Sequence, residues 1–264
     1  MTAPVTALTL LRAVAAGEGS LAPVHAALGT ALDAVEPGHA AARVPRLPPH
    51  RLHGPGVVAV LGDLVLSAAI TSSLAAGLRI STLTLHTAML GPLPPPGAAL
   101  LARADLVAPA GATAVSRAEV LAADGRPVAH LAARCAVLPS TGGGALFHEP
   151  ADPDPFAALG PELRAAPTLA NSAGGVQGGV LAAVVGHRIT AALPDGVACD
   201  HDVTFVRGIP ADGAPMSVDV EVRHGGRRLF AADARLHDAN GRVAVLASAA
   251  GWLDPRGESG DRAR

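Results

Sequence analysis

Two short stretches of this 264-residue sequence each begin with glycines and continue as an apolar helix, and one of them carries a carboxylate that could act as an acid or base. The first, Gly54 to Gly77, is apolar for about five helical turns and carries one charged residue, Asp63. The second, Gln177 to Leu193, begins with Gln177, Gly178 and Gly179. A carboxylate can activate water or act as a nucleophile, and free N–H groups at a helix start stabilise negative charge. Since a buried carboxylate without a function is costly, these stretches form the candidate site.

The two stretches belong to two copies of one structural unit. Three pairs of landmarks occur in the same order, at offsets of 123, 118 and 116 residues: Gly56 and Gly179, Pro92 and Pro210, and the turns Asp124-Gly125-Arg126 and Asn240-Gly241-Arg242. Small loop deletions that leave the order unchanged are typical of a diverged internal duplication. We predict four regions: a first repeat with an N-terminal extension (1–138), a linker (139–167), a second repeat (168–253) and a tail (254–264).

Each repeat is predicted to contain one helix followed by an antiparallel meander of four strands. Alternating apolar residues and turn signals place strands at 79–90, 99–109, 113–122 and 127–138, and again near 197–206, 215–224, 228–237 and 242–252. One or two helices are expected before Gly29, a short strand within 31–44, a loop at 45–55 and a short helix at Phe156 to Leu159.

The apolar helices explain why two repeats occur in one chain. A helix that is apolar nearly all round must be covered on most of its surface, and one curved sheet covers only one side. The second repeat covers the rest. The predicted fold class is therefore α+β, with two repeats that each wrap an antiparallel sheet around a central helix.

Composition excludes several classes of function. The net charge of -2, without a basic cluster, and 2% aromatic residues argue against nucleic-acid binding. Cys135 and Cys199 lack metal-ligand spacing and are expected to be free thiols in a reducing cytoplasm. No signal peptide is predicted, and Asp63 with several Ser and Thr argues against a membrane span in the first helix. No metal or redox cofactor is expected.

The stretch Asn171 to Gly179, NSAGGVQGG, resembles the N-x-x-G-x-x-H-G-G stretch of PaaI-type hotdog thioesterases, with Gln177 in the place of His. In the first half, Gly54-Pro55-Gly56 occupies the H-G-G position, and Asp63 lies where that family has its catalytic carboxylate. Segments 73–96 and 192–213 resemble its second strand and closing proline turn. The resemblance covers residues 25–138 and 168–253, and implies a tandem, double hotdog enzyme that hydrolyses acyl-CoA to free acid and coenzyme A.

The resemblance implies a site between the two repeats. Asp63 would be its general base or nucleophile, and the Gly179 N–H would contact the developing oxyanion. Asn171 and Gln177 would orient the carbonyl or the water, and the Thr82 hydroxyl would help to position that water.

Further residues are assigned to substrate binding on the same resemblance. They are Gly178, Gly56 and Arg207, with Arg227 and Arg228 as other candidates for the phosphates of coenzyme A. A second site, in which the two repeats exchange roles, would lack its functional residues. Gly186 occupies its carboxylate position, and His53 lies one position before the place of the motif's His. One working site per chain is therefore expected.

Two other functions are kept as alternatives. A non-catalytic acyl or acyl-CoA binding protein of the same fold would explain Gln177 in place of His and the lost second site. A hotdog hydratase or dehydratase is disfavoured, since no Asp-x4-His pairing occurs in the expected loop context. The substrate itself would supply coenzyme A, and the expected assembly is a homodimer of double hotdogs, without nucleic-acid or membrane partners.

Overall fold

The computed structural model describes residues 6–48, 55–140, 160, 162–193 and 195–253. The helices are α1 (Ala7–Ala15), α2 (Pro23–Ala27), α3 (Pro55–Thr71), the short 3-10 helix η2 (Pro167–Leu169) and α4 (Gly178–Ala192). The strands are β1 (Ala31–Glu36), β2 (His39–Val44), β3 (Leu78–Met89), β4 (Leu100–Ala110), β5 (Thr113–Ala122), β6 (Pro127–Pro139), β7 (Gly196–Phe205), β8 (Ser217–Gly225), β9 (Leu229–His237) and β10 (Val243–Leu253). The expected helix at Phe156 to Leu159, the 254–264 tail, His53 and Gly54 lie outside the described residues.

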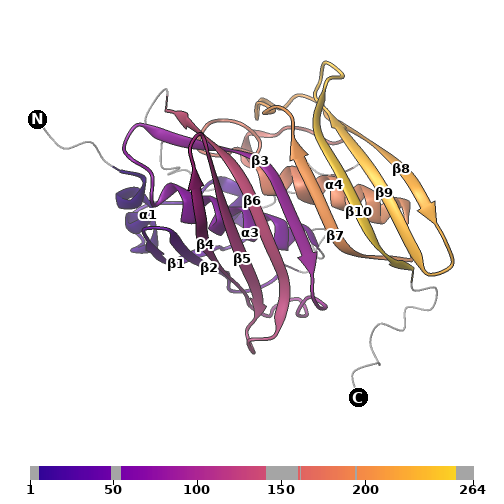
Figure 1. Ribbon diagram of the computed structural model, residues 1–264, viewed down its shortest axis with the longest axis horizontal. Helices are drawn as coiled ribbons and strands as arrows, with labels where there is room; N and C mark the ends of the chain where they lie inside the picture. Colours follow the sequence, from indigo (N-terminus) through magenta and orange to yellow (C-terminus); the bar gives the residue numbers. More distant parts are fainter. Residues whose placement is uncertain (1–5, 49–54, 141–159, 161, 194, 254–264) are drawn as a thin grey trace, which may run out of the picture.

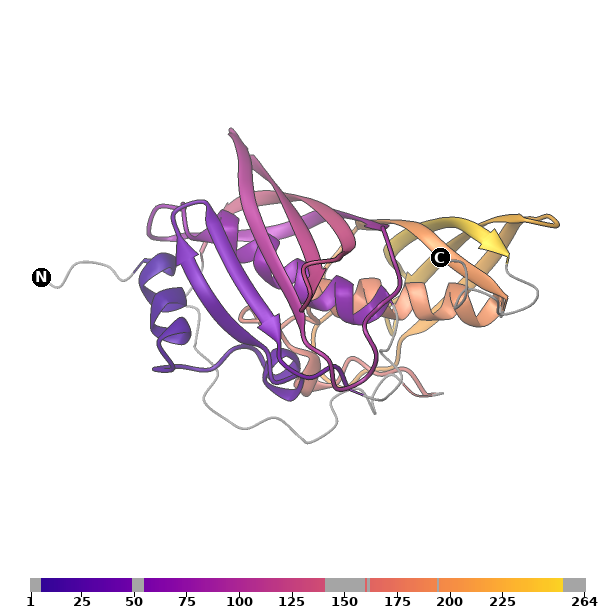
Figure 2. The same ribbon diagram turned by 90° about the horizontal axis from the view of Figure 1, so that it is seen from below.

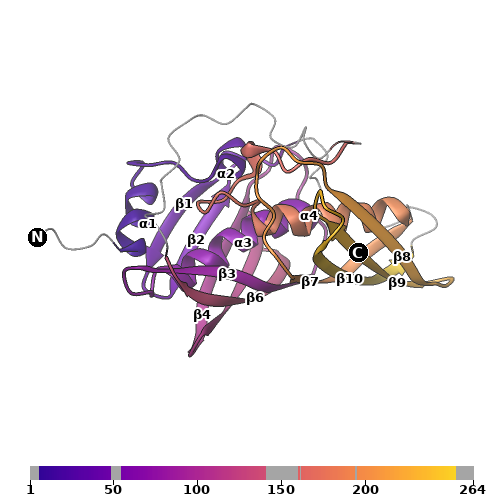
Figure 3. The same ribbon diagram turned by 90° about the horizontal axis from the view of Figure 1, so that it is seen from above.

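The strands form one ten-stranded antiparallel sheet in the order β1-β2-β4-β5-β6-β3-β7-β10-β9-β8 (Figure 1). Strands β3 and β7 pair along the seam between the two repeats, with Leu85 opposite Val203. Helices α3 and α4 contact each other on one face of this sheet (Figures 2 and 3). This is the predicted α+β architecture, in which each repeat has a central helix and an antiparallel sheet.

The first repeat wraps more completely around its helix than the second. Strands β1 and β2 turn over α3 on the side opposite β3 and β6, so α3 lies between them (Figure 3). Because α3 is apolar on all sides, this enclosure and the contact with α4 bury Val58, Val60 and Leu61 completely. The buried side chains of both repeats form a single hydrophobic cluster. The two repeats therefore share one core.

The prediction of a four-stranded meander is wrong in each repeat. Strands β4, β5 and β6 are neighbours, but the chain between Met89 and Leu100 crosses over, so that β3 lies beside β6 instead of β4. The same crossing places β7 beside β10. The physical reason lies in the connections: short turns at Gly111 and Gly125 join β4, β5 and β6 as neighbours, whereas the ten residues between Met89 and Leu100 are too many for a tight hairpin and can cross over.

The region 31–44 also differs from its prediction, because it contains a hairpin of two strands instead of one. Strands β1 and β2 are joined at Gly38, which has a φ of 79° and so adopts the left-handed conformation that glycine favours. The turns at Gly125 and Gly241 have φ values of 85° and 71° and join β5 to β6 and β9 to β10 as expected.

Within the described part of the chain, every helix is too short or too polar to cross a lipid bilayer.

Candidate active site

The site is centred on Asp63, which lies in the middle of α3 with only 4% of its surface exposed. Its Oδ2 atom accepts a hydrogen bond of 2.8 Å from Gln177 Nε2 and another of 3.0 Å from the Gly179 N–H. Both donors belong to the start of α4, in the other repeat. The contact of α3 with α4 therefore brings together the acid of the first repeat and the glycine-rich helix start of the second.

Gln177 is held in place at both ends. It is the N-cap of α4, and its Oε1 atom accepts the N–H of Val180 at 3.0 Å, which satisfies one of the free donors of the first helical turn. Its backbone N–H donates to the carbonyl of Leu169 in η2 at 2.9 Å. With the carbonyl end of the side chain fixed in this way, its NH₂ group faces Asp63.

The glycines at this helix start permit a close contact that any larger residue would prevent. A Cβ atom at Gly179 would lie 2.6 Å from the carbonyl oxygen of Ala59 and 2.7 Å from Cα of Val60. A Cβ atom at Gly178 would lie 3.3 Å from Asp63 Oδ2 and 3.5 Å from the ring of Phe205. The two helices therefore approach to backbone contact at Gly179, which allows its N–H to reach the carboxylate.

The hydrogen bond of Gly179 changes how the helix start can bind an oxyanion. The Gly179 N–H was expected to be free for this purpose, but in the structure it donates to Asp63 Oδ2. Gly178 occupies the first helical position, where an N–H has no partner inside the helix. Among the described residues no hydrogen bond is found for the Gly178 N–H, and an added Cβ at Gly178 would lie 3.3 Å from Asp63 Oδ2.

The electrostatic environment keeps Asp63 poised to exchange a proton near neutral pH. Burial raises the pKa of its carboxyl group from 3.8 to about 6, and the Gly179 N–H and the Thr82 hydroxyl oppose this rise by favouring the ionised form. Its Oδ1 atom is buried and makes no hydrogen bond that meets ordinary distance and angle limits within the described residues, although the Thr82 hydroxyl lies close enough to act on the pKa. Asp63 therefore presents one occupied and one open oxygen.

Thr82 on β3 is itself contacted from β6. The thiol of Cys135 lies 3.9 Å from Thr82 Oγ1 and can donate a weak hydrogen bond to it. Burial and the nearby charge of Asp63 raise the pKa of the Cys135 thiol to about 12, so this sulfur stays protonated. A protonated thiol in this position leaves the hydroxyl hydrogen of Thr82 available to the carboxylate.

Three of the predicted site residues make no contact with this group. Asn171 Oδ1 accepts the N–H groups of Ala173 at 2.9 Å and Gly175 at 3.2 Å, so the side chain shapes the turn that leads to α4. Arg207 donates to the carbonyl of Val243 at 2.9 Å. Gly56 lies two helical turns before Asp63, about 10 Å along the axis of α3.

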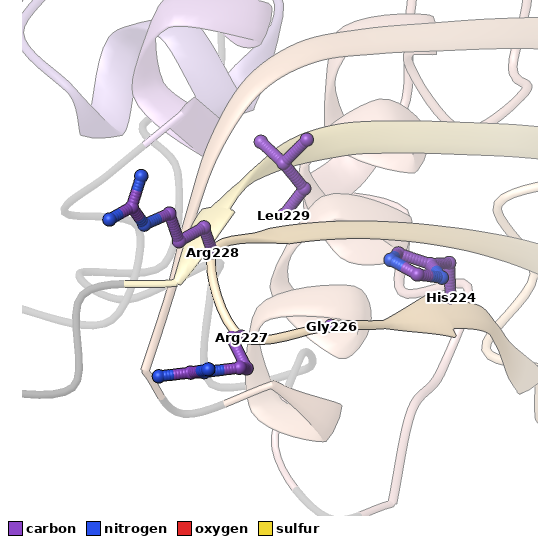
Figure 4. A pocket seen from close by; sticks show the side chains of 5 residues that line it. All are labelled: His224, Gly226, Arg227, Arg228 and Leu229. Carbon is purple, nitrogen blue, oxygen red and sulfur yellow. The ribbon is translucent and has the colours of Figure 1, made fainter.

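The other two candidate arginines line a hollow elsewhere in the protein. Arg227 and Arg228, with His224, Gly226 and Leu229, surround a space of about 400 Å³ at the hairpin between β8 and β9 (Figure 4). This hairpin lies beside the outer edge of the second repeat, whereas Asp63 contacts the start of α4 at the centre of the molecule. The three basic side chains do not converge on one point. They therefore do not form part of the site at Asp63.

The corresponding position in the second repeat has no acid. Gly186 takes the place of Asp63 on α4, and a Cβ atom added there would lie 3.4 Å from the imidazole of His201 on β7. Burial lowers the pKa of His201, and its Nε2 atom has no partner among the described residues. The two repeats thus contribute one carboxylate between them, on the first helix.

One residue that contacts the site could not be recognised from the sequence. His25 on α2 is 3% exposed, and its Nε2 atom lies 3.5 Å from Gln177 Nε2. Burial lowers the pKa of its imidazole to about 4, so His25 is neutral at physiological pH. Nothing in its spacing to Asp63 or Gln177 sets it apart from the other ten histidines, because only the tertiary structure brings α2 to the start of α4.

The structure, but not the sequence, has clear relatives. No protein-family model matches the sequence, and no curated protein matches it either. The tesB protein of Mycobacterium avium subsp. paratuberculosis has 16% sequence identity and a TM-score of 0.59, over 89% of this chain and 100% of that one. The acyl-CoA thioesterase II TesB2 of Mycobacterium marinum has 15% identity and a TM-score of 0.57, over 88% and 98%. The oleoyl thioesterase (putative) of Lactobacillus plantarum has 10% identity and a TM-score of 0.58, over 83% and 98%.

These similarities extend over nearly the whole length of both partners in each comparison, and they establish the fold. The protein is an α+β protein of the double hotdog type, with both repeats in one chain.

Proposed function

We propose that this protein hydrolyses an acyl-CoA thioester to the free acid and coenzyme A, at Asp63 between the two repeats. The observation that carries the proposal is the state of the carboxylate. One oxygen is fixed by Gln177 and Gly179 of the other repeat, and the other is buried and makes no hydrogen bond of ordinary geometry among the described residues. A fixed carboxylate with one open oxygen can accept a proton from water or attack a carbonyl carbon.

The reaction requires both a base and an oxyanion donor. In the water route, Asp63 Oδ1 takes a proton from water while the water oxygen attacks the thioester carbonyl carbon. The carbonyl oxygen becomes negatively charged and is stabilised by the Gly178 N–H at the positive end of the α4 dipole. The C–S bond then breaks, and the thiolate leaves and takes up the proton.

In the nucleophilic route, Asp63 Oδ1 attacks the same carbon and the thiolate leaves, which gives a mixed anhydride that water then cleaves. The two routes differ in the origin of one oxygen atom. A single turnover in ¹⁸O-labelled water places the label in the product acid in the water route. It places the label in Asp63 when water cleaves the anhydride at the protein carbonyl.

The relatives support this class of substrate without specifying it. Those of Mycobacterium marinum and Lactobacillus plantarum are named as acyl-CoA and oleoyl thioesterases, and another similar structure is an acyl-ACP thioesterase of Bacteroides thetaiotaomicron. The PaaI-type assignment rests on sequence resemblance, chiefly on the stretch from Asn171 to Gly179 together with the position of Asp63. We choose coenzyme A over carrier protein as the acyl carrier on this resemblance.

The direct test is to assay the purified protein with a series of acyl-CoA thioesters of increasing chain length and a thiol-trapping dye. Release of free thiol that depends on enzyme concentration is expected for at least one chain length. The same assay with acyl carrier protein thioesters distinguishes the two carriers. Absence of turnover with every thioester contradicts the proposal. Light scattering of the same sample tests the predicted homodimer.

A non-catalytic binding protein is favoured by one specific observation. Asp63 is 4% exposed and already accepts two hydrogen bonds, so a substrate reaches its open oxygen only after the covering groups move apart. Under this alternative, acyl-CoA would raise the melting temperature of the protein without releasing a thiol. Thermal shift and thiol release on the same sample separate the two functions.

The raised pKa of Asp63 predicts the pH dependence of turnover. Because the ionised carboxylate is the active form in both routes, kcat/KM should rise with pH through an apparent pKa of about 6 and then level off. Below pH 6 the rate should fall about tenfold for each pH unit. Initial rates between pH 4.5 and about 8 measure this, and full recovery after return to neutral pH controls for unfolding. A profile that is flat through pH 6 contradicts the assignment of Asp63.

Replacement of Thr82 by Val should move this pH profile. The hydroxyl lowers the pKa of Asp63, so Thr82→Val is expected to raise that pKa and shift the acid limb to higher pH. We expect kcat near pH 6 to fall about tenfold, as for the loss of one hydrogen bond to a charged group. Thr84→Val is the matched control, because Thr84 lies exposed on the same strand. Equal profiles for the two variants would leave Thr82 without a part in the reaction.

A further inference from the structure

We propose that His25 is a positioning residue, which orients the amide of Gln177 so that one N–H points at Asp63. This proposal rests on the proposed function, because it assigns a role at the same site. It adds α2 to that site, although α2 carries none of the residues from Asn171 to Gly179 that resemble other thioesterases.

The hydrogen bonds around Gln177 determine which way its amide points. Oε1 accepts the Val180 N–H at 3.0 Å, so the NH₂ group occupies the other end. One of its hydrogens is directed to Asp63 Oδ2 at 2.8 Å, and the other faces His25 Nε2 at 3.5 Å. The opposite orientation would place an amide oxygen against a carboxylate oxygen and an NH₂ group against an N–H. The network therefore allows one orientation only.

The same network determines the tautomer of His25. Because an amide N–H faces Nε2, this nitrogen must be the acceptor and the ring proton must lie on Nδ1. Nδ1 is buried and has no partner among the described residues. A protonated imidazole would direct an N–H at the amide N–H of Gln177 and would break the contact. A neutral ring, which burial favours, is thus the form that can hold Gln177.

The backbone of His25 is fixed independently of this contact. The His25 N–H donates to the carbonyl of Ala22 at 2.9 Å, and its own carbonyl accepts the N–H of Thr30 at 2.8 Å. Helix α2 packs against η2, and Leu169 of η2 accepts the backbone N–H of Gln177. The imidazole and the backbone of Gln177 are therefore supported by the same pair of elements, which keeps their separation constant.

The contact has a consequence for the carboxylate that can be measured. If the second N–H of Gln177 loses its acceptor, the bonds to Val180 and Asp63 remain but the amide can tilt from its best alignment, and Asp63 then loses part of a donor that favours its ionised form. The titratable groups that face this network are Asp63 from α3 and Cys135 from β6, along with His25 itself. Since Cys135 stays protonated, changes in the titration near pH 6 report on Asp63.

The experiment compares His25→Leu with His25→Gln in the full-length protein. Leu fills a similar volume without an acceptor, whereas the amide oxygen of Gln can take the place of Nε2. The control is His201→Leu, which removes another buried imidazole that contacts α4 at Gly186. The readouts are the ¹³C chemical shift of the Asp63 carboxyl group between pH 4 and 8, kcat and KM, and the melting temperature.

For His25→Leu we expect the pKa of Asp63 to rise by up to about one unit, and kcat at about pH 5 to fall about tenfold with little change in KM. The melting temperature should stay unchanged or rise, because the variant removes a buried N–H group that has no partner. His25→Gln should restore both the pKa and kcat. His201→Leu should leave the titration of Asp63 unchanged.

The proposal is overturned if His25→Leu titrates like the unsubstituted protein, or if His25→Gln behaves like His25→Leu. A fall in melting temperature with an unchanged Asp63 titration would show that His25 serves the fold alone. The carboxyl titration needs no turnover, so it still tests the role of His25 if no thioester is hydrolysed. Failure of the proposed function and failure of this proposal are thus separate results.

Discussion

Asp63→Asn is expected to lower kcat by about three orders of magnitude, because it removes the only carboxylate in contact with the start of α4 within the described residues. Asparagine has nearly the same shape, and its carbonyl oxygen can still accept hydrogen bonds from Gln177 and Gly179. The variant therefore tests the charge and basicity of Asp63 separately from its packing. Thiol release at pH 8 measures the effect.

The same substitution should make the protein more stable. Burial raises the pKa of Asp63 from 3.8 to about 6, so the folded state binds the proton more tightly than the unfolded state. The resulting stabilisation is complete below pH 3.8 and is lost as the pH rises through 6. Above that pH the ionised group costs about 3 kcal/mol, at about 1.4 kcal/mol for each pKa unit. Asp63→Asn removes up to this cost.

Urea denaturation at pH 5 and pH 8 checks the prediction, since the gain should be larger at pH 8. Asp219→Asn serves as the control, because this carboxylate is 77% exposed in an ion pair with His237 on the outer strands. It should change neither kcat nor the pH dependence of stability by a comparable amount. A large loss of stability in Asp63→Asn would mean that the carboxylate holds the two repeats together instead of serving the reaction.

Gly179→Ala is expected to destabilise the protein and abolish turnover together. The added Cβ would lie 2.6 Å from the Ala59 carbonyl oxygen and 2.7 Å from Val60 Cα, and both of these are backbone atoms that cannot rotate away. Helices α3 and α4 must then separate, which opens the shared core and withdraws the Gly179 N–H from Asp63. Overpacking of this kind costs about 3 kcal/mol in the free energy of unfolding.

Two other glycines make this prediction specific. Gly208→Ala is the control, because an added Cβ meets nothing within 4 Å and the backbone is outside the left-handed region. Gly178→Ala should lie between the two, since its Cβ would be 3.3 Å from Asp63 Oδ2 and 3.5 Å from Phe205. We expect it to reduce kcat much more than it reduces the melting temperature. Normal stability of Gly179→Ala would contradict the backbone contact between the helices.

The extents of the eight strands from β3 to β10 followed closely from local signals. The alternation in 113–122 predicts β5 with its bounds, and the turns at Gly125 and Gly241 place the hairpins, because these properties depend on neighbouring residues. The order of the strands in the sheet could not be derived from such local signals. Whether β3 lies beside β4 or β6 depends on the path of the connection between Met89 and Leu100 and on the pairing with β6, where Thr82 lies opposite Cys135.

The residues of the candidate site also fall into two groups, those that the sequence placed in the site correctly and those that it did not. Asp63 could be identified from the sequence because a lone charge in an apolar helix is unusual, and Gln177-Gly178-Gly179 because the stretch resembles a thioesterase motif. Asn171 and Arg207 were also selected from the sequence. In the structure the Asn171 side chain bonds to its own turn, and Arg207 bonds to Val243 of β10. A residue type at a suitable spacing does not determine the direction of its side chain.

The sequence by itself determined that this chain is a duplicated α+β protein with one acid and one glycine-rich helix start, since these are properties of local pattern and repetition. The tertiary structure alone decided that the Gly179 N–H is used to hold Asp63, and that His25 reaches Gln177. Both contacts depend on how closely α3, α4 and α2 approach one another. Packing of the whole core sets that approach, and no single stretch of sequence encodes it.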